Sequence, residues 1–510
     1  AEVPEKALEY LDKAGEQALN RDYANERAVR FLTEAIELDT TLGQPDNTLE
    51  LRRARRYRQL GEAYFNLAKY AEGHTHLERT LSLLGHPLPG SRWGEAANLL
   101  TAVVRQGWHR LAHSINRRAA RGQSPSLLEA ARAFSRLGSI YYVTERKAPF
   151  ISSLVSALNV AELAEPTPEL ALAYANMGNV AGHIPMHALA RAYVRLALTV
   201  ADQVNRPATT AMVLTRPSIY RGAMCDWQVL ELLERSMEIA DRLNNSYQWE
   251  ESATILAGLT YHRGRFGFSA DLGGRVYERA SQSATPIHQM WGLAARAQGL
   301  LRLGRADQAV ELAEMALGLL ANSDSALPDV AIWAHGILAT ARIRQGKLDL
   351  AADAAGAIEA DIARSSGVGY LSALGLSGLA EVYLTQWERG PTSAGIPEAA
   401  RQACQALRRY ARRYRSALPG ALLWRGWSYW LAGHRRRAHR AWRRSLMTAQ
   451  RLSMPYDQGL AHYEIARHLD PQEPAHSDHL RRATEIFAGL GAAYDLGRAG
   501  DLARSGSIGG

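Results

Sequence analysis

Arginine gives the strongest chemical signal in this 510-residue sequence. Residues 399–456 contain fourteen arginines and no aspartate or glutamate. Most of them follow the spacing of two predicted helices, with Arg408, Arg409, Arg412, Arg413 and Arg415 on the first and Arg435, Arg436, Arg437, Arg440, Arg443 and Arg444 on the second. A surface of one sign attracts anions at long range. From this set we take as candidate partner-binding residues Arg408, Arg412, Arg436, Arg440 and Arg443.

Several anionic counterparts are compatible with this arginine-rich region. They are an acidic protein or sister domain, a nucleotide, nucleic-acid phosphates and acidic lipid headgroups. Nucleic acid is less favoured than a protein, because the nearby aromatic residues follow helical spacing rather than forming a stacking platform. The alternative is a solvated helix face without a partner.

The sequence lacks the motifs of common catalytic and metal sites. It contains no GxxxxGK[ST] phosphate loop, and the glycine-rich residues 264–274 do not follow a predicted strand. His462 and His468 are six residues apart, whereas a zinc-binding helix needs two histidines four apart. Cys225 and Cys404 form no paired-cysteine motif, and both are predicted to be buried or inert. We therefore expect no enzyme activity, no metal and no cofactor.

The elements that position these residues are predicted to be helical hairpins. In residues 422–452, small and large residues recur at three- and four-residue spacing on both sides of a turn near Gly433. This pattern is typical of two packed antiparallel helices. It returns along the chain at intervals of about 40 residues or a multiple of that. The small residues at the expected helix contacts are Gly61, Gly138, Gly178, Gly258, Ala297, Ala339, Ala380 and Gly426.

The hairpins resemble the tetratricopeptide (TPR) repeat, in a form longer than its usual roughly 34 residues. Residues 23–39, 454–469 and 483–499 also resemble the C-terminal TPR region of multidomain signalling proteins. Those proteins carry a nucleotide cyclase or a protein kinase, followed by a signal-transduction ATPase module, and are similar to soluble adenylyl cyclase in layout. The resemblance implies a regulatory or interaction segment. No motif of those catalytic modules occurs in this sequence.

Four tryptophans and one asparagine are candidate ligand-binding residues of the concave groove. Trp291 and Trp333 stand six residues before a small contact residue, and Trp427 and Trp430 stand one and four residues after one. These positions predict side chains that face the groove, where aromatics anchor ligands. The alternative is that the indoles are buried between repeats. Asn179 directly follows a contact residue, and resemblance to peptide-binding TPRs implies that it bonds a peptide backbone.

The composition is that of a folded helical protein. Hydrophobic residues make up 47% and charged residues 22% of the chain, and the formal net charge is +9. No apolar run reaches the roughly 18 residues of a membrane span, and no signal peptide is recognised. We therefore expect a cytoplasmic location. Because the sequence begins with alanine rather than methionine, we also expect a fragment of a larger protein.

The predicted fold is all-α, a right-handed superhelical solenoid of about eleven or twelve TPR-like hairpins. Its expected parts are N-terminal hairpins at 1–118, a linker-like break at 119–126, the main superhelix at 127–500 and a flexible tail at 501–510. Within these parts, residues 91–118 are expected to form an atypical helical pair. Pro217 is expected to kink or break its helix.

The predicted function is a non-catalytic interaction and regulatory scaffold. It would bind a protein segment, or its own missing ATPase or cyclase modules, through the concave groove and the arginine-rich face. One alternative is a sensor that binds a small molecule or nucleotide and regulates an attached ATPase or cyclase. The third is nucleic-acid binding through the basic residues.

Overall fold

The computed structural model describes residues 2–20, 24–42, 47–111, 124–164, 166–365, 369–390 and 394–507. These ranges contain 24 α-helices and no strand. The helices are α1 (Glu2–Asn20), α2 (Asn25–Leu42), α3 (Asn47–Asn66), α4 (Tyr70–Leu83), α5 (Arg92–Leu111), α6 (Ser124–Val143), α7 (Lys147–Ala161), α8 (Pro168–His183), α9 (His187–Val204), α10 (Pro207–Ala223), α11 (Val229–Arg242), α12 (Ser246–His262), α13 (Phe266–Gln282), α14 (Pro286–Arg302), α15 (Ala306–Ala321), α16 (Pro328–Arg344), α17 (Leu348–Arg364), α18 (Ala373–Glu388), α19 (Ile396–Arg413), α20 (Leu418–Leu431), α21 (Arg435–Arg451), α22 (Pro455–Arg467), α23 (Pro474–Leu490) and α24 (Ala493–Ser507). None of them is long and apolar enough to cross a bilayer.

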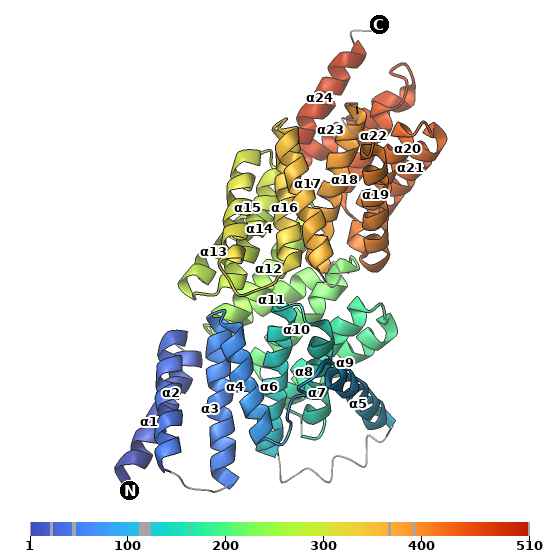
Figure 1. Cartoon of the computed structure of the whole chain (residues 1–510). Coiled ribbons are helices and arrows are strands. Elements are labelled where there is room, and N and C mark those ends of the chain that lie inside the picture. The colour runs from blue at the N-terminus through green and yellow to red at the C-terminus, as the bar shows by residue number, and fades with distance from the viewer. Residues whose placement is uncertain are drawn as a thin grey trace.

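The helices form a tandem array of hairpins. In the described ranges, eleven successive pairs run from α1/α2 and α3/α4 through α6/α7 to α22/α23, and α5 and α24 stand outside this pairing. Figure 1 shows them following one another in chain order, from α1 at the lower left to α24 at the top. The chain is therefore an all-α solenoid of TPR-type hairpins, as predicted.

Four hairpins share one contact geometry, which explains the repeated small residues. A glycine of the first helix faces a side chain sixteen residues later on the second helix. These pairs are Gly61 with Leu77, Gly138 with Leu154, Gly178 with Val194 and Gly426 with Trp442. A Cβ on any of the four glycines would stand 2.9 Å or less from that side chain. Only glycine lets the two helices approach this closely.

Gly258 does not fit this geometry, which corrects one predicted contact. A Cβ on Gly258 would meet nothing within 4 Å, and the residue lines the inner cavity described below. The preceding residue, Ala257, is fully buried. The packed small residue of this repeat therefore lies one position earlier than the sequence pattern suggested.

Three further details differ from the sequence prediction. The described part of residues 91–118 is one helix, α5, rather than a pair, and it carries both Trp93 and Trp108. Residues 112–123, with most of the predicted break at 119–126, lie outside the described residues; α6 begins at Ser124. At the C-terminus, α24 continues to Ser507, so most of the expected tail at 501–510 is helical.

Pro217 does not end its helix. Helix α10 continues through it to Ala223, and Pro217 is buried. Proline removes one backbone donor, which would have bonded the carbonyl four residues earlier. The neighbouring turn is held by other bonds, since Ser218 Oγ donates to the Leu214 carbonyl at 2.7 Å and Thr215 Oγ1 donates to the Ala211 carbonyl at 3.0 Å.

Turns far apart in sequence touch, so the array winds back onto itself. The Ala326 amide donates to the Val143 carbonyl at 2.9 Å. Arg413 Nε donates to the His183 carbonyl at 2.5 Å. Further along, the Trp227 indole donates to a backbone carbonyl 225 residues later, that of Leu452, at 2.8 Å. These contacts join successive turns of the superhelix.

Candidate functional site

The concave side of the array holds a cavity of about 1110 Å³. Its walls come mainly from the first helices of the pairs, α3, α6, α8, α10, α12, α14 and onward to α22. This matches the predicted orientation, in which first helices line the groove. The polar residues of the N-terminal half that line it include Arg58, Glu62, Ser135, Ser139 and the predicted Asn179.

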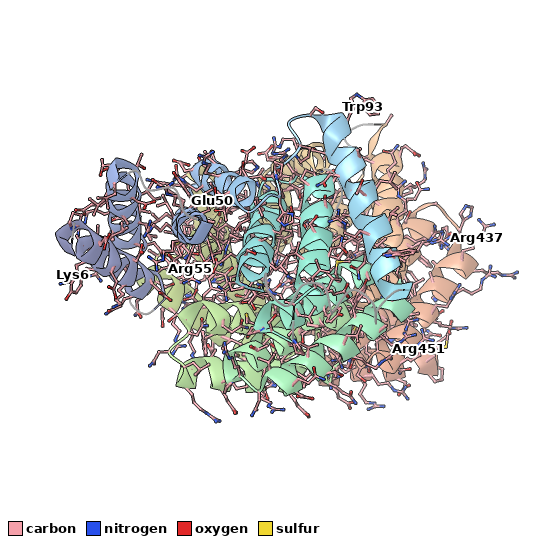
Figure 2. The ribbon with its side chains drawn as sticks, turned by 90° about the horizontal axis from the view of Figure 1, so that it is seen from below. Lys6, Glu50, Arg55, Trp93, Arg437 and Arg451 are labelled. Carbon is pink, nitrogen blue, oxygen red and sulfur yellow. The ribbon has the colours of Figure 1, made fainter. Side chains whose placement is uncertain are left out.

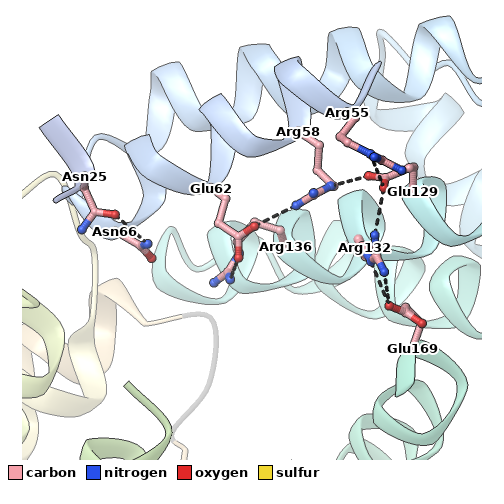
Figure 3. Close-up of polar contacts among 9 residues, drawn as sticks. All are labelled: Asn25, Arg55, Arg58, Glu62, Asn66, Glu129, Arg132, Arg136 and Glu169. Carbon is pink, nitrogen blue, oxygen red and sulfur yellow. Dashed lines mark hydrogen bonds and ion pairs between the residues drawn. The ribbon is translucent and has the colours of Figure 1, made fainter. Parts of the chain in front are cut away.

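A ladder of ion pairs forms the N-terminal end of the cavity (Figure 3). Arg58 of α3 binds Glu129 of α6 with Nε and Oε2 2.6 Å apart, and it also binds Glu62, with Nη1 and Oε2 2.8 Å apart. Arg132 binds Glu169 of α8, with Nη2 and Oε1 2.8 Å apart. Each guanidinium here contacts at least one carboxylate, although four arginines, with Arg55 and Arg136, share three glutamates, so this end of the cavity is a poor anion site.

The local electrostatics keep these carboxylates ionised. Burial would raise the pKa of Glu62, but the guanidinium groups of Arg136 and Arg58 outweigh burial and hold that pKa below its usual value. Burial likewise opposes ionisation of Glu129, and Arg58 outweighs it, so the pKa of Glu129 is also lowered. The ladder is therefore a wall of ionised side chains whose opposite charges largely cancel.

The middle of the cavity differs, because buried polar atoms there have no partner. Six such atoms belong to cavity-lining residues in the described part of the chain. They are Asn179 Oδ1, Arg216 Nε, Glu251 Oε2, Trp291 Nε1, Gln298 Nε2 and Ser416 Oγ. Glu251 and Gln298 are each 5% exposed, and Ser416 is 3% exposed. An unpaired buried polar group costs about 1–3 kcal/mol, so each of these atoms favours a ligand that supplies the missing partner.

Neighbouring bonds fix the directions of these free atoms. Arg216 of α10 pairs with Glu251 of α12, with Nη1 and Oε1 2.6 Å apart, which leaves Nε and Oε2 unbonded. The Trp333 indole donates to Gln298 Oε1 at 3.1 Å, which leaves the Gln298 amide nitrogen as a donor. The side chains are thus held in place, and one polar atom of each is buried without a partner.

The C-terminal end of the cavity is a second polar cluster. Arg302 donates to the hydroxyls of Tyr261 and Tyr456 at 2.7 Å each, and Tyr456 donates to Asp495 at 2.8 Å. Asp457 lines the cavity beside this cluster. Burial raises the pKa of the Asp457 carboxyl to about 7, although Arg302 favours its ionised form. This carboxyl therefore changes charge near neutral pH.

Two of the four candidate tryptophans line the cavity and two do not. Trp291 and Trp333 line the cavity, although Trp333 is also buried. Trp427 and Trp430 do not line it, and the groove position expected for them is wrong. The Trp427 indole donates to Glu388 at 3.0 Å, and Trp430 packs against the ring of His468, with the ring centroids 4.3 Å apart.

Position along the helix explains this difference. The cavity extends along α20 only as far as Leu423 and Trp424, and Trp427 and Trp430 lie about one and two turns beyond. Trp424, which the sequence pattern missed, lines the cavity and donates to Ser377 at 2.7 Å. Gln298 was also missed, yet it follows Ala297 as Asn179 follows Gly178, so the repeat alignment contained a signal for it.

The arginine-rich face lies outside the cavity. The candidates on α19 and α21, Arg408, Arg412, Arg436, Arg440 and Arg443, are all exposed. Within the described residues, none of the five pairs with a carboxylate, whereas Arg401 at the start of α19 pairs with Glu398. Figure 2 shows Arg437 and Arg451 of α21 pointing outward at one side of the molecule.

The cysteines and histidines form no metal cluster in the described residues. Cys404 is buried and Cys225 is half-buried, and burial raises the pKa of both thiols to about 12, so they stay protonated. His462 and His468 do not converge: His462 Nδ1 lies 2.7 Å from His479 Nδ1, and His468 lies against Trp430 and Trp442.

No protein-family model matches the sequence, and no curated protein matches it. Three solved structures are similar to it in fold. A Rap protein complexed with Competence and Sporulation Factor aligns over 78% of this chain and 98% of its own, with 13% identity and a TM-score of 0.43. An IFIT1 monomeric mutant with m7Gppp-AAAA aligns over 70% and 78%, with 14% identity and a TM-score of 0.41.

The third is a Signal Transduction ATPase with Numerous Domains from Pyrococcus horikoshii that has a tetratricopeptide repeat sensor. It aligns over 87% of this chain, with 12% identity and a TM-score of 0.32. The aligned part is 55% of that protein. At these values the likeness is limited to the helical-repeat fold.

Proposed function

We propose that this chain is a non-catalytic, cytoplasmic interaction array that holds an extended segment of polypeptide along its inner cavity. One observation carries the proposal: the six unpartnered buried polar atoms of the cavity wall. Four of the six residues lie on α8, α10 and α12 and at the first half of α14, so they are distributed along successive repeats. A segment laid across those repeats meets a new polar atom at each one.

The mixture of donors and acceptors favours a peptide backbone over a polyanion. Arg216 Nε, Trp291 Nε1 and Gln298 Nε2 donate, and Asn179 Oδ1 and Glu251 Oε2 accept. A peptide offers an N–H and a C=O at every residue, whereas phosphates offer acceptors alone. Because the guanidinium groups of the ladder already bind carboxylates, the N-terminal end of the cavity is a poor site for a nucleic acid.

The arginine-rich face supports a second contact with the same partner. Its unpaired guanidinium groups on α19 and α21 fit an acidic protein surface, such as that of an attached ATPase or cyclase module. The segment in the cavity would then belong to that module or to a separate protein. In this role the array reports the presence of the segment to the module and performs no chemistry.

A small-molecule or nucleotide sensor is the second candidate function. It uses the same cavity, whose volume is close to the roughly 300–1,000 Å³ of known ligand pockets. Asp457 favours this candidate, because a carboxyl that titrates near pH 7 would make binding of a cationic ligand depend on pH. Native mass spectrometry of the purified chain separates the two candidates, since a retained small molecule appears as a defined mass increment.

The test of the leading proposal uses peptides selected from a random phage-displayed library on the immobilised chain. We expect Asn179→Ala and Gln298→Ala together to weaken the selected peptides by about 10- to 100-fold in calorimetry, since each removes a bond worth about 1 kcal/mol or more. Gln458→Ala, which removes an amide that bonds the Ala449 carbonyl outside the cavity wall, is a matched control for altered packing. If no peptide is selected, or if the double variant binds normally, the cavity does not hold a polypeptide.

The arginine-rich face is tested separately with an acidic protein domain of the proposed ATPase or cyclase kind. Changing Arg436, Arg440 and Arg443 together to glutamate should abolish capture of an acidic module while peptide binding in the cavity persists. Added salt should weaken the wild-type complex, because exposed charges are screened beyond about 8–10 Å. Capture that survives both changes would leave these arginines as solvated surface.

A further inference from the structure

Helix α5 is amphipathic, but it turns its polar side toward the protein and its apolar side toward solvent. Its polar residues face the protein: Glu95 pairs with Arg146, and the Asn98 amide donates to Ser152 Oγ at 3.0 Å. Four residues further along the same side, the Ala102 carbonyl accepts a bond from Asn159 at 2.8 Å. All of these partners lie at or next to α7, so polar contacts fix α5 to the array beside the buried side chain of Ala102.

The apolar side of α5 faces outward. Its exposed side chains are Trp93 (87% exposed), Leu100 (66%), Val103 (50%), Val104 (64%) and Trp108 (64%). Residues 93, 97, 100, 104 and 108 fall on one stripe, because they are spaced four, three, four and four residues apart. Figure 2 shows Trp93 at one end of α5, pointing away from the other helices. A contiguous apolar stripe of this kind marks an interaction surface.

We propose that this stripe binds α5 of a second copy of the chain, in an antiparallel, two-fold symmetric contact. The stripe is self-complementary about a point between Leu100 and Thr101. With the axis there, Trp93 lies opposite Trp108 of the second copy. On the same basis, Ala97 lies opposite Val104 of the second copy, so a small residue meets a larger one. Such mutual matching is what a two-fold interface requires.

The available area suits a dimer of modest affinity. Allowing for their partial exposure, four indoles bury roughly 500–750 Å² in total, since an aromatic side chain buries roughly 150–250 Å². Leu100, Val103 and Val104 of both copies raise the total towards the roughly 1,000 Å² that a specific interface needs. The proposal is independent of the inner cavity, because α5 contributes no residue to the cavity wall.

The charge pattern favours a second copy over an acidic membrane. Glu95, the one acidic residue of α5, is turned inward, and Arg105 is the exposed charge on the described side chains of the helix. Adsorption to acidic lipid needs a cluster of basic residues, which this stripe lacks. In the dimer the two Arg105 residues lie about 13–14 Å apart along the helix axes, so their repulsion is screened.

Sedimentation velocity of the full chain, from low micromolar to several hundred micromolar, tests the proposal. We expect a concentration-dependent dimer, and Leu100→Glu should abolish it at every concentration. Leu100 is mostly exposed, so circular dichroism should show the variant folded. Met447→Glu, at a 59% exposed apolar residue on α21, is the matched control and should leave the dimer intact.

Cross-linking tests the register. An oxidised mixture of Ala97→Cys and Val104→Cys chains should give a disulfide-linked pair, whereas each variant alone should give far less. The wild-type chain controls for links through Cys225 or Cys404. A chain that stays monomeric, a dimer that survives Leu100→Glu, or a monomer that instead sediments with phosphatidylserine vesicles would overturn the proposal.

Discussion

Gly178 shows how one side chain sets the distance between two helices. A Cβ at this position would lie 2.9 Å from Val194 Cγ2 and 3.4 Å from the Ala190 carbonyl oxygen. We predict that Gly178→Leu lowers the free energy of unfolding by about 1–3 kcal/mol, because α8 and α9 must move apart. Thermal and urea unfolding measure it.

Gly258 is the matched control, since a Cβ there meets open space. Gly258→Ala should raise stability by about 0.5–1 kcal/mol through reduced freedom of the unfolded chain. A stable Gly178→Leu variant would show that α8 and α9 do not depend on this close contact.

Asp457 links stability to pH. Its pKa is raised by burial to about 7 from an unfolded value of about 3.9, so the folded state holds the proton more tightly. Stability is therefore lost as pH rises through this interval. We predict that Asp457→Asn raises the melting temperature at pH 8 by more than at pH 5. Asp353→Asn, on an exposed position of α17, should show no such difference, and a pH-independent gain at Asp457 would contradict the raised pKa.

At the scale of helices, the ion-pair ladder joins α3 to α6 at the N-terminal end of the cavity. Glu129 is 1% exposed and meets Arg58 with Nε and Oε2 2.6 Å apart. Glu129→Ala removes a carboxylate that Arg58 and Arg132 share, but these arginines keep Glu62 and Glu169, so the change should cost about 1.5–3 kcal/mol. The exposed pair of Glu398 and Arg401 is the control, and Glu398→Ala should cost about 1 kcal/mol or less. Urea unfolding followed by circular dichroism compares the two, and equal costs would show that the ladder contributes no more than a surface pair.

The same ladder predicts loss of stability in acid. The folded-state pKa values of Glu62 and Glu129 are lowered, so their contribution is present above the unfolded pKa of about 4.3 and is lost as pH falls below it. Glu129→Gln should flatten this acid transition relative to the wild type. An unchanged acid transition in that variant would assign it to other carboxylates.

The sequence predicted the helical hairpins better than it predicted which residues line the cavity. Repeated small residues identified the hairpins because close helix contacts leave room for nothing larger, as at Gly426 against Trp442. The same pattern placed Asn179 and Trp291 in the groove correctly. It failed for Trp427 and Trp430 because helical spacing gives the face of a residue but does not tell how far along α20 the cavity extends.

Ion pairs between residues of different repeats could not be predicted from the sequence for a related reason. Arg216 meets Glu251, and Arg58 meets Glu129, only because successive hairpins rotate by a particular angle. That angle depends on the packing of every neighbouring repeat, and no local spacing encodes it. The sequence marks residues 91–118 as atypical. Only the structure shows that α5 turns its polar side inward and exposes Trp93 and Trp108.

For the whole molecule, contacts between distant turns decide whether the cavity stays closed. A solenoid is held mainly by contacts between neighbouring repeats, which permit bending and changes of pitch. The bond from the Trp227 indole to the Leu452 carbonyl spans two turns that are far apart in sequence. Trp227→Phe keeps the aromatic ring and removes the donor, which leaves a carbonyl without its partner at a cost of about 1–3 kcal/mol.

We predict that Trp227→Phe opens the superhelix without unfolding it. Hydrogen exchange should rise in the turns around residues 225–228 and 451–454, and small-angle scattering should give a larger radius of gyration. Ligands of the cavity should bind and leave faster, since the closed state is less favoured. Trp387→Phe, at an indole of α18 that lies in neither turn and packs against Arg401, is the control for a general effect of losing an indole. Unchanged exchange in both turns would mean that neighbour packing alone fixes the pitch, and that ligands enter the cavity without any opening of the array.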